Sequence, residues 1–238
     1  MKFLFYALAL TLAAPAFADE APSPLSFNLS VASDYRYRGI SQTRARPALQ
    51  GGADYAAANG LYVGTWASSI QWIKDAGGGA DAELDLYGGY KADIAPGLTA
   101  DVGLLRYAYP SNRLNPGANT LEVYAALSAG PVTAKYSHGT TNLFGFPDSK
   151  GSAYLEVAGS FELGDGLTLT PHVGHQTVRR NAAASYTDAS LTLAKDFSGL
   201  VLSGAVVGTD AERSAYTSAA TGRFLGKTGF VLALKKTF

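Results

Sequence analysis

Apolar and polar residues alternate along most of the chain, two residues to a repeat. The pattern is clearest over residues 25–38, where Phe27, Leu29 and Val31 share one parity and polar side chains such as Asn28 take the other. A repeat of two predicts a β-strand with one apolar face and one polar face. The run is longer than the strands of most globular cores, which favours a strand that crosses a membrane.

Eleven further segments repeat this alternation more weakly. They lie at residues 48–56, 61–70, 82–92, 98–109, 120–128, 132–139, 152–162, 167–178, 188–195, 200–209 and 228–238. With the first run they predict about twelve strands, each long enough to cross a bilayer at a tilt.

The connections between these segments alternate in length. Short gaps rich in Gly, Pro, Asn or Asp fall at 57–60, 93–97, 129–131, 163–166 and 196–199, and longer polar gaps fall at 40–47, 71–81, 110–119, 140–151, 179–187 and 210–227. This order is typical of an outer-membrane barrel, which has short periplasmic turns and longer external loops. The predicted fold is therefore an all-β, antiparallel transmembrane β-barrel of about 12 strands.

Both ends of the chain fit an exported barrel. Residues 1–18 have a positive start, an apolar stretch too short to span a bilayer and a small-x-small cleavage site, so we expect a signal peptide. Residues 19–24 would be a short lead-in and 25–238 the barrel. The chain ends in an alternating strand that closes on Phe238, as outer-membrane barrels do.

Composition narrows the possible functions. The 19 basic and 19 acidic residues balance, which argues against a nucleic-acid partner, and the absence of cysteine excludes disulfides and thiolate metal sites. His172 and His175 are three residues apart and would point to opposite faces of a strand, so we expect no metal and no cofactor.

If the apolar parity faces lipid, the polar parity faces the lumen. The predicted pore-lining residues carry both charge signs, as a selectivity region would. Two interpretations remain open: the charges filter solutes, or they pair across the lumen and fill it. The residues are Asp34, Arg36, Arg38, Glu83, Asp85, Glu122, Glu156 and His172.

Aromatic residues gather near the predicted strand ends. Such positions suit a belt of rings at the membrane–water interface. The expected interface aromatics are Tyr35, Tyr37, Trp66, Tyr107, Tyr109 and Phe238.

Catalytic constellations are weak. Ser137 and His138 are adjacent, so on a strand they point to opposite faces and cannot form a nucleophile and base pair without a bulge. Asn142 lies close by in sequence, which leaves a lipid-modifying barrel enzyme as an alternative.

Several sequence runs resemble a known family. The runs are SDYRYRGISQT at 33–43, GLYVGTWAS at 60–68 and ELDLYGGY at 83–90, with shorter matches at 101–103, 107–110 and 135–137. In them the chain resembles the TorF-type family of porins, exported proteins of Gram-negative bacteria. The resemblance implies an outer-membrane barrel with porin function and brings no catalytic residues. Lys236 departs from the pattern, because outer-membrane barrels usually place an apolar residue at that position of the last strand.

We therefore expect a porin-like channel in the bacterial outer membrane that passes small hydrophilic solutes and is not an enzyme. Its expected partners are outer-membrane lipid, small polar solutes and, through the C-terminal strand, the barrel-assembly machinery. A lipid-modifying enzyme, a plugged structural or adhesive barrel and a soluble periplasmic barrel remain the alternatives.

Overall fold

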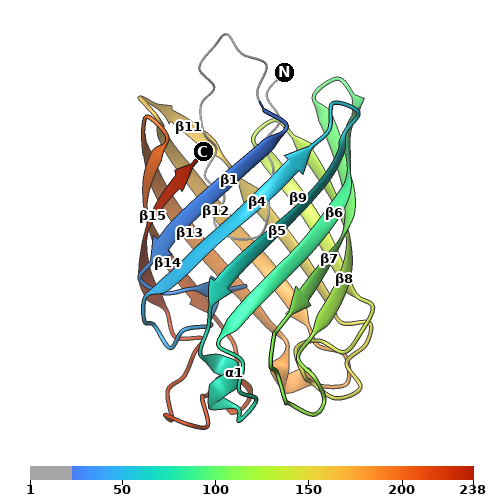
Figure 1. The fold of residues 1–238 in the computed structure, drawn as a ribbon, viewed down its shortest axis with the longest axis vertical. Helices are drawn as coiled ribbons and strands as arrows, with labels where there is room; N and C mark the ends of the chain where they lie inside the picture. The colour runs from blue at the N-terminus through green and yellow to red at the C-terminus, as the bar shows by residue number, and fades with distance from the viewer. Residues whose placement is uncertain (1–22) are drawn as a thin grey trace.

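The strands form one closed antiparallel barrel (Figure 1). The computed structural model describes residues 23–238, and within them twelve strands make up the wall, β10 and β11 counting as one interrupted strand. The wall strands are β1 (Leu25–Ala32), β4 (Ala48–Ala56), β5 (Leu61–Ser69), β6 (Ala82–Ala95), β7 (Leu98–Ala108), β8 (Thr120–Ala129), β9 (Val132–Gly139), β10 (Ala153–Gly159) with β11 (Phe161–Gly164), β12 (Leu167–Thr177), β13 (Tyr186–Phe197), β14 (Leu200–Thr209) and β15 (Gly229–Thr237).

The loops hold the remaining elements. They are β2 (Arg36–Tyr37), β3 (Ile40–Ser41), α1 (Trp72–Asp75), the 3-10 turn η1 (Ala182–Ala184) and α2 (Arg213–Tyr216). No helix within residues 23–238 is both long and apolar enough to cross a membrane. The signal peptide expected at residues 1–18 lies outside the described residues.

Closure of the barrel joins the two ends of the described chain. β15 pairs with β1, with Val31 opposite Leu234, while β1 also pairs with β4. Each remaining wall strand pairs with the strands before and after it. A closed ladder leaves no strand edge, so the backbone N–H and C=O groups of the wall bond within the wall. The predicted barrel class is confirmed.

Turns and loops separate to opposite ends, as the alternating gap lengths predicted. In Figure 1 the five short turns lie at the top and the long loops, with α1, at the bottom. Each short turn contains a glycine with a positive φ, which tight hairpins require. These glycines are Gly60, Gly97, Gly130, Gly166 and Gly199. We call the two ends the short-turn end and the long-loop end.

The first predicted strand, residues 25–38, was too long. β1 ends at Ala32, and Ser33 still borders β15, where its Oγ accepts the Leu232 N–H at 2.9 Å. The chain then turns into the barrel interior, and residues 36–37 form the separate strand β2. Because β2 is itself extended, the period of two continues through the turn and hides the change of direction.

The wall has an apolar outer face and a mixed, largely polar inner face. On β1, Phe27, Leu29 and Val31 are exposed, whereas Gln50 and Ser68 on the two following strands point inward and are buried. The same division holds around the barrel. Such a belt of exposed apolar side chains is typical of strands that face lipid.

A small apolar core fills part of the interior at the long-loop end. It brings together rings and aliphatic side chains from the wall and from the first three long loops: Tyr35, Ala48, Trp66, Ile70, Ile73, Ala80, Leu105, Tyr107, Tyr109 and Ala118. The long-loop half of the barrel is therefore packed.

Two neighbouring alanines at mid-strand test which face contacts lipid. Ala125 on β8 is exposed on the outer face, whereas Ala126 points inward, with Asp101 of β7 opposite it. We expect Ala125→Arg to destabilise the barrel in bilayers by about 2–4 kcal/mol, because the charge enters hydrocarbon.

Ala126→Arg is the matched control and is expected to have the smaller effect, since its charge stays in the polar interior, between Asp101 of β7 and Lys135 of β9. Denaturant unfolding in vesicles, followed by the shift in gel migration on heating, measures both. Equal stability of the two variants would contradict the lipid-facing assignment.

Candidate functional site

The first long loop, residues 33–47, folds into the barrel and forms what we call the lumen hairpin. β2 and β3 pair with each other there, with Tyr37 opposite Ile40, and not with the wall. Arg38 and Gly39 connect them with φ of 45° and 80°. Positive φ at both central residues is the geometry of a two-residue type I′ hairpin, in which glycine is strongly favoured.

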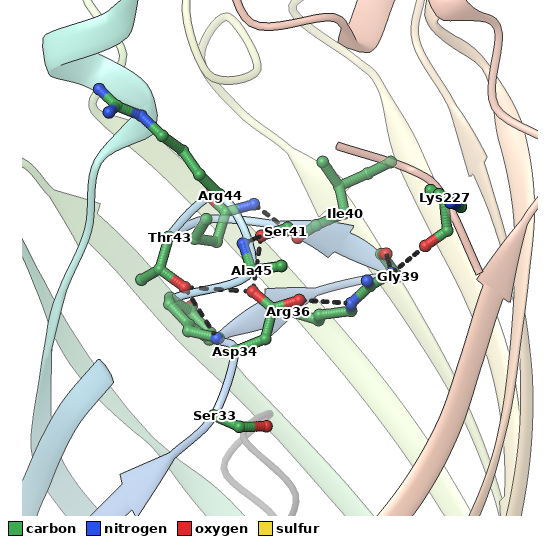
Figure 2. A network of polar contacts seen from close by, with 12 residues as sticks. Ser33, Asp34, Arg36, Gly39, Ile40, Ser41, Thr43, Arg44, Ala45 and Lys227 are labelled. Carbon is green, nitrogen blue, oxygen red and sulfur yellow. Dashed lines mark hydrogen bonds and ion pairs between the residues drawn. The ribbon is translucent and has the colours of Figure 1, made fainter. Parts of the chain in front are cut away.

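Asp34 organises the base of the hairpin (Figure 2). Its Oδ2 accepts the Arg36 Nε–H at 2.8 Å, and its Oδ1 accepts the hydroxyls of Ser41 at 2.6 Å and Thr43 at 3.1 Å. Arg36 Nη1 also donates to the carbonyl of Gly39 at 3.1 Å and to that of Lys227 at 2.7 Å. The hairpin is therefore cross-linked within itself and to the last long loop.

Arg38, next to the tip, joins the hairpin to the opposite wall. Its guanidinium makes a bidentate ion pair with Glu122 of β8, at 3.0 and 2.7 Å, and donates to Gln176 of β12 at 2.7 Å. It also lies 4.2 Å from the ring centroid of Tyr154 on β10. The side chains of Arg38 and Glu122 are 1% and 2% exposed. A bidentate, buried pair of this kind fixes position as well as charge.

Tyr35 and Tyr37 attach the hairpin to the preceding strands of the wall. The Tyr35 hydroxyl donates to Glu83 of β6 at 2.6 Å, and the Tyr37 hydroxyl donates to that of Tyr107 on β7 at 2.9 Å. The Tyr35 ring meets Trp66 edge to face at 5.3 Å. With Arg38, these contacts tie the hairpin to a continuous arc of the wall that runs from β5 to β12.

The expected belt of interface aromatics is wrong for the buried rings. Tyr35, Trp66, Tyr107 and Tyr109 are at most 7% exposed and lie inside the barrel, and Tyr37 packs against the same core. Phe238 alone of the set is exposed. The alternation along each strand could have predicted this. Trp66 has the same inward parity as Ser68 on β5, and a ring near a strand end can lie on either face.

The predicted pore-lining residues all reach the interior, by two routes. Glu83, Asp85, Glu122, Glu156 and His172 project inward from the wall. Asp34, Arg36 and Arg38 arrive on the lumen hairpin and not on β1, which corrects their assumed position. Of these hairpin residues, Arg38 is ion-paired with a wall carboxylate, that of Glu122, whereas Arg36 pairs with Asp34 inside the hairpin.

A second polar cluster lies on the β10–β13 wall. His172 Nε2 lies 3.0 Å from Glu156 Oε2, and the Tyr154 hydroxyl donates to Asp188 of β13 at 2.8 Å. Because Tyr154 also contacts Arg38, it links this cluster to the lumen hairpin. Among residues 23–238, no three His, Asp or Glu side chains form a metal-ligating group.

Sequence reasoning missed a group of tyrosines toward the short-turn end. Tyr62 donates to Asp101 at 2.6 Å and meets the hydroxyl of Tyr124, and Tyr87 bonds to Asp54. Lys135 lies 4.2 Å above the Tyr124 ring.

Each of these rings lies over a glycine on the neighbouring strand. Tyr62 is opposite Gly89, Tyr87 opposite Gly64 and Tyr124 opposite Gly103. A Cβ on any of these glycines would collide with the facing ring. The sequence could have predicted these contacts, because each tyrosine and its glycine occupy inward-facing positions on neighbouring strands.

The hypothetical catalytic group is divided by the wall. Ser137 is buried inside the barrel, whereas His138 follows Tyr136 on the outer parity and contacts its hydroxyl at 3.3 Å. Asn142 accepts the Lys150 N–H in the fourth long loop. The three side chains do not form a nucleophile, base and orienting group.

The fold and its interior define the class: a twelve-stranded barrel of the porin type, with a loop folded into it. A KdgM porin structure is similar, with TM-score 0.59 and 9% identity over 90% of this chain and 99% of that chain. A NanC porin structure gives TM-score 0.56 and 10% identity over 90% and 98%. At such identities the likeness shows the fold.

The sequence itself identifies the family. Residues 16–238 match the family model described as "Bacterial protein of unknown function (Gcw_chp)", and the chain belongs to that family. No curated protein sequence matches the chain.

The Arg38 ion pair should hold the lumen hairpin in place. In Arg38→Met the Glu122 carboxylate loses its buried partner, and breaking such pairs costs about 3–5 kcal/mol. We expect the amides of residues 33–43 to exchange with deuterium at least about tenfold faster. Arg46→Met is the control, since Arg46 is an exposed residue of the same loop. Unchanged exchange in Arg38→Met would show that the pair does not fix the hairpin.

Gly39 tests the contact between the hairpin tip and the wall. A Cβ at Gly39 would collide with Thr209 and Asp188, whereas Gly77, with nearly the same φ of 83°, has nothing within 4 Å of that position. Both Gly→Ala changes carry the same backbone cost of about 1–2 kcal/mol. We expect Gly39→Ala to lower the unfolding free energy by more than Gly77→Ala does. Equal losses would mean that the tip contact adds nothing.

Proposed function

We propose that this protein is an outer-membrane channel for passive diffusion of small hydrophilic solutes, with the lumen hairpin as its constriction. The observation that carries the proposal is a closed barrel, apolar outside, whose polar interior is crossed by one anchored loop. Hydrophilic solutes could pass only through such an interior, because the outer face is apolar. Under this proposal the short turns face the periplasm and the long loops face outward.

The chemistry of the interior favours small polar solutes of low net charge. Arg38 is neutralised by Glu122, whereas Glu156 and Asp188 share one histidine, His172, so acidic groups are in slight excess at the constriction and disfavour anionic solutes. Toward the short-turn end, tyrosine hydroxyls and lysines line the wall. The KdgM porin has a solved structure in complex with oligogalacturonate, which shows that a barrel of this fold binds an acidic sugar chain. For the present chain we propose smaller and less charged solutes.

The finer assignments belong to the same proposal. They are membership of the TorF-type porins, contact with outer-membrane lipid, recognition of the C-terminal strand by the barrel-assembly machinery, and absence of enzymatic activity. The division of Ser137 and His138 between two faces supports the last of these.

One observation favours a second candidate, a plugged structural barrel. The long-loop half of the interior is packed with buried aromatic side chains around the hairpin. If that packing persists in the membrane, solutes would not pass.

Planar-bilayer recording distinguishes the two. We expect small single-channel currents from the native protein and larger ones from the Arg36→Ala, Arg38→Ala double variant, because both substitutions release the hairpin. Arg46→Ala removes one positive charge from an exposed position of the same loop and should leave conductance unchanged.

Equal conductance and ion selectivity in the native protein and the double variant would show that the hairpin is not the constriction. No current from either protein, with correct folding shown by heat-modifiable gel migration, would favour the plugged barrel.

A further inference from the structure

A cationic pocket lies at the long-loop end, outside the barrel interior. It encloses about 520 Å³ between the end of β9 and the loops at residues 140–152 and 178–185. Lys150, Arg179 and Arg180 line it, together with His138 and Asn142, and Asp148 is its only carboxylate. The pocket has three permanent positive charges and one negative charge, and this excess of positive charge favours an anionic ligand.

The loops hold the basic groups together. Arg179 Nη1 donates to the Lys150 carbonyl at 3.3 Å, and Asn142 Oδ1 accepts the Lys150 N–H at 3.1 Å. A Cβ at Gly151 would lie 3.1 Å from Arg179 Nη1, so the glycine makes room for the guanidinium. The pocket is formed by contacts between two loops that are distant in sequence.

The pocket borders the apolar outer face. His138 continues the outer parity of Tyr136 on β9 and stacks on that ring at a centroid distance of 6.2 Å. On the neighbouring strands Leu155 and Val173 are exposed, at 55% and 48%. The cationic side chains therefore lie next to the edge of an apolar surface. This arrangement suits a ligand that has an anionic group and an apolar part.

We propose that this pocket binds the phosphate group of a phosphorylated glycolipid in the outer leaflet. Arginine and lysine are the side chains that proteins use for phosphate, with arginine able to donate two parallel hydrogen bonds. The acyl chains would lie along Tyr136, Leu155 and Val173. The assignment of the leaflet rests on the proposed outward orientation of the long loops, whereas the pocket's chemistry does not depend on channel activity.

Native mass spectrometry of the full-length mature protein in detergent tests the site. The probes are lipid A with both phosphates, the same lipid without phosphate, and inorganic phosphate. We expect the bisphosphorylated lipid to bind at least about tenfold more tightly than the dephosphorylated one, because hydrogen bonds to charged groups are lost with the phosphates. Added salt should weaken that binding, since the site is exposed.

Matched double variants locate the site. Arg179→Gln with Arg180→Gln should weaken binding of the bisphosphorylated lipid at least about tenfold. Arg46→Gln with Arg213→Gln removes the same charge from exposed positions in other long loops and should leave binding unchanged. Gel migration before and after heating checks that all variants are folded.

Three results would overturn the proposal: equal binding of both lipids, equal loss in the two double variants, or inorganic phosphate binding as tightly as the lipid. The absence of cysteine allows a separate check of orientation. Ala183→Cys in the fifth long loop should react with a membrane-impermeant maleimide on intact cells, and failure to react would overturn the leaflet assignment. Bilayer currents report on the channel alone, so a silent channel that still binds the phosphorylated lipid would contradict only the proposed function.

Discussion

The hydrogen-bond ladder closes where β15 meets β1, and this closure determines how every other group is distributed. Because the wall has no edge, its backbone groups are satisfied within it, and side chains can point only outward or inward. Outward positions are apolar along the belt, with Phe27, Leu29 and Val31 as the example on β1. Most polar and charged residues of the wall thereby face the interior, where burial favours those that find partners.

The lumen hairpin supplies many of those partners. Burying an arginine and a carboxylate is costly unless the two are paired, and Arg38 offsets much of this cost by contacting Glu122, Gln176 and Tyr154 on three strands, although its Nε has no hydrogen-bond partner. Asp34 does the same within the hairpin, where Arg36, Ser41 and Thr43 donate to it. The ion pair between Arg38 and Glu122 thus exists because a loop brings the arginine to the wall.

Sequence alone predicted the wall well, because a repeat of two follows directly from strand geometry and the turn residues mark where each strand stops. Residues 48–56, 132–139 and 200–209 agree with β4, β9 and β14. The inward fold of residues 33–47 could not be predicted in this way, since β2 is extended and continues the alternation. Trp66 and Tyr107 were assigned to an outer belt by their place near strand ends, although parity along β5 and β7 puts both inside. Which wall residues meet the hairpin depends on barrel curvature, which no local pattern records.

The glycines opposite Tyr62, Tyr87 and Tyr124 affect the width of the bore. The number of strands sets the diameter of the backbone cylinder, but the open cross-section depends on how far side chains extend toward the axis. A ring packed directly against Gly89, Gly64 or Gly103 can lie closer to the wall than a ring packed against a larger residue. One methyl group on any of these glycines would lift the ring toward the centre. These three glycines therefore let the tyrosine rings lie close to the wall, away from the barrel axis.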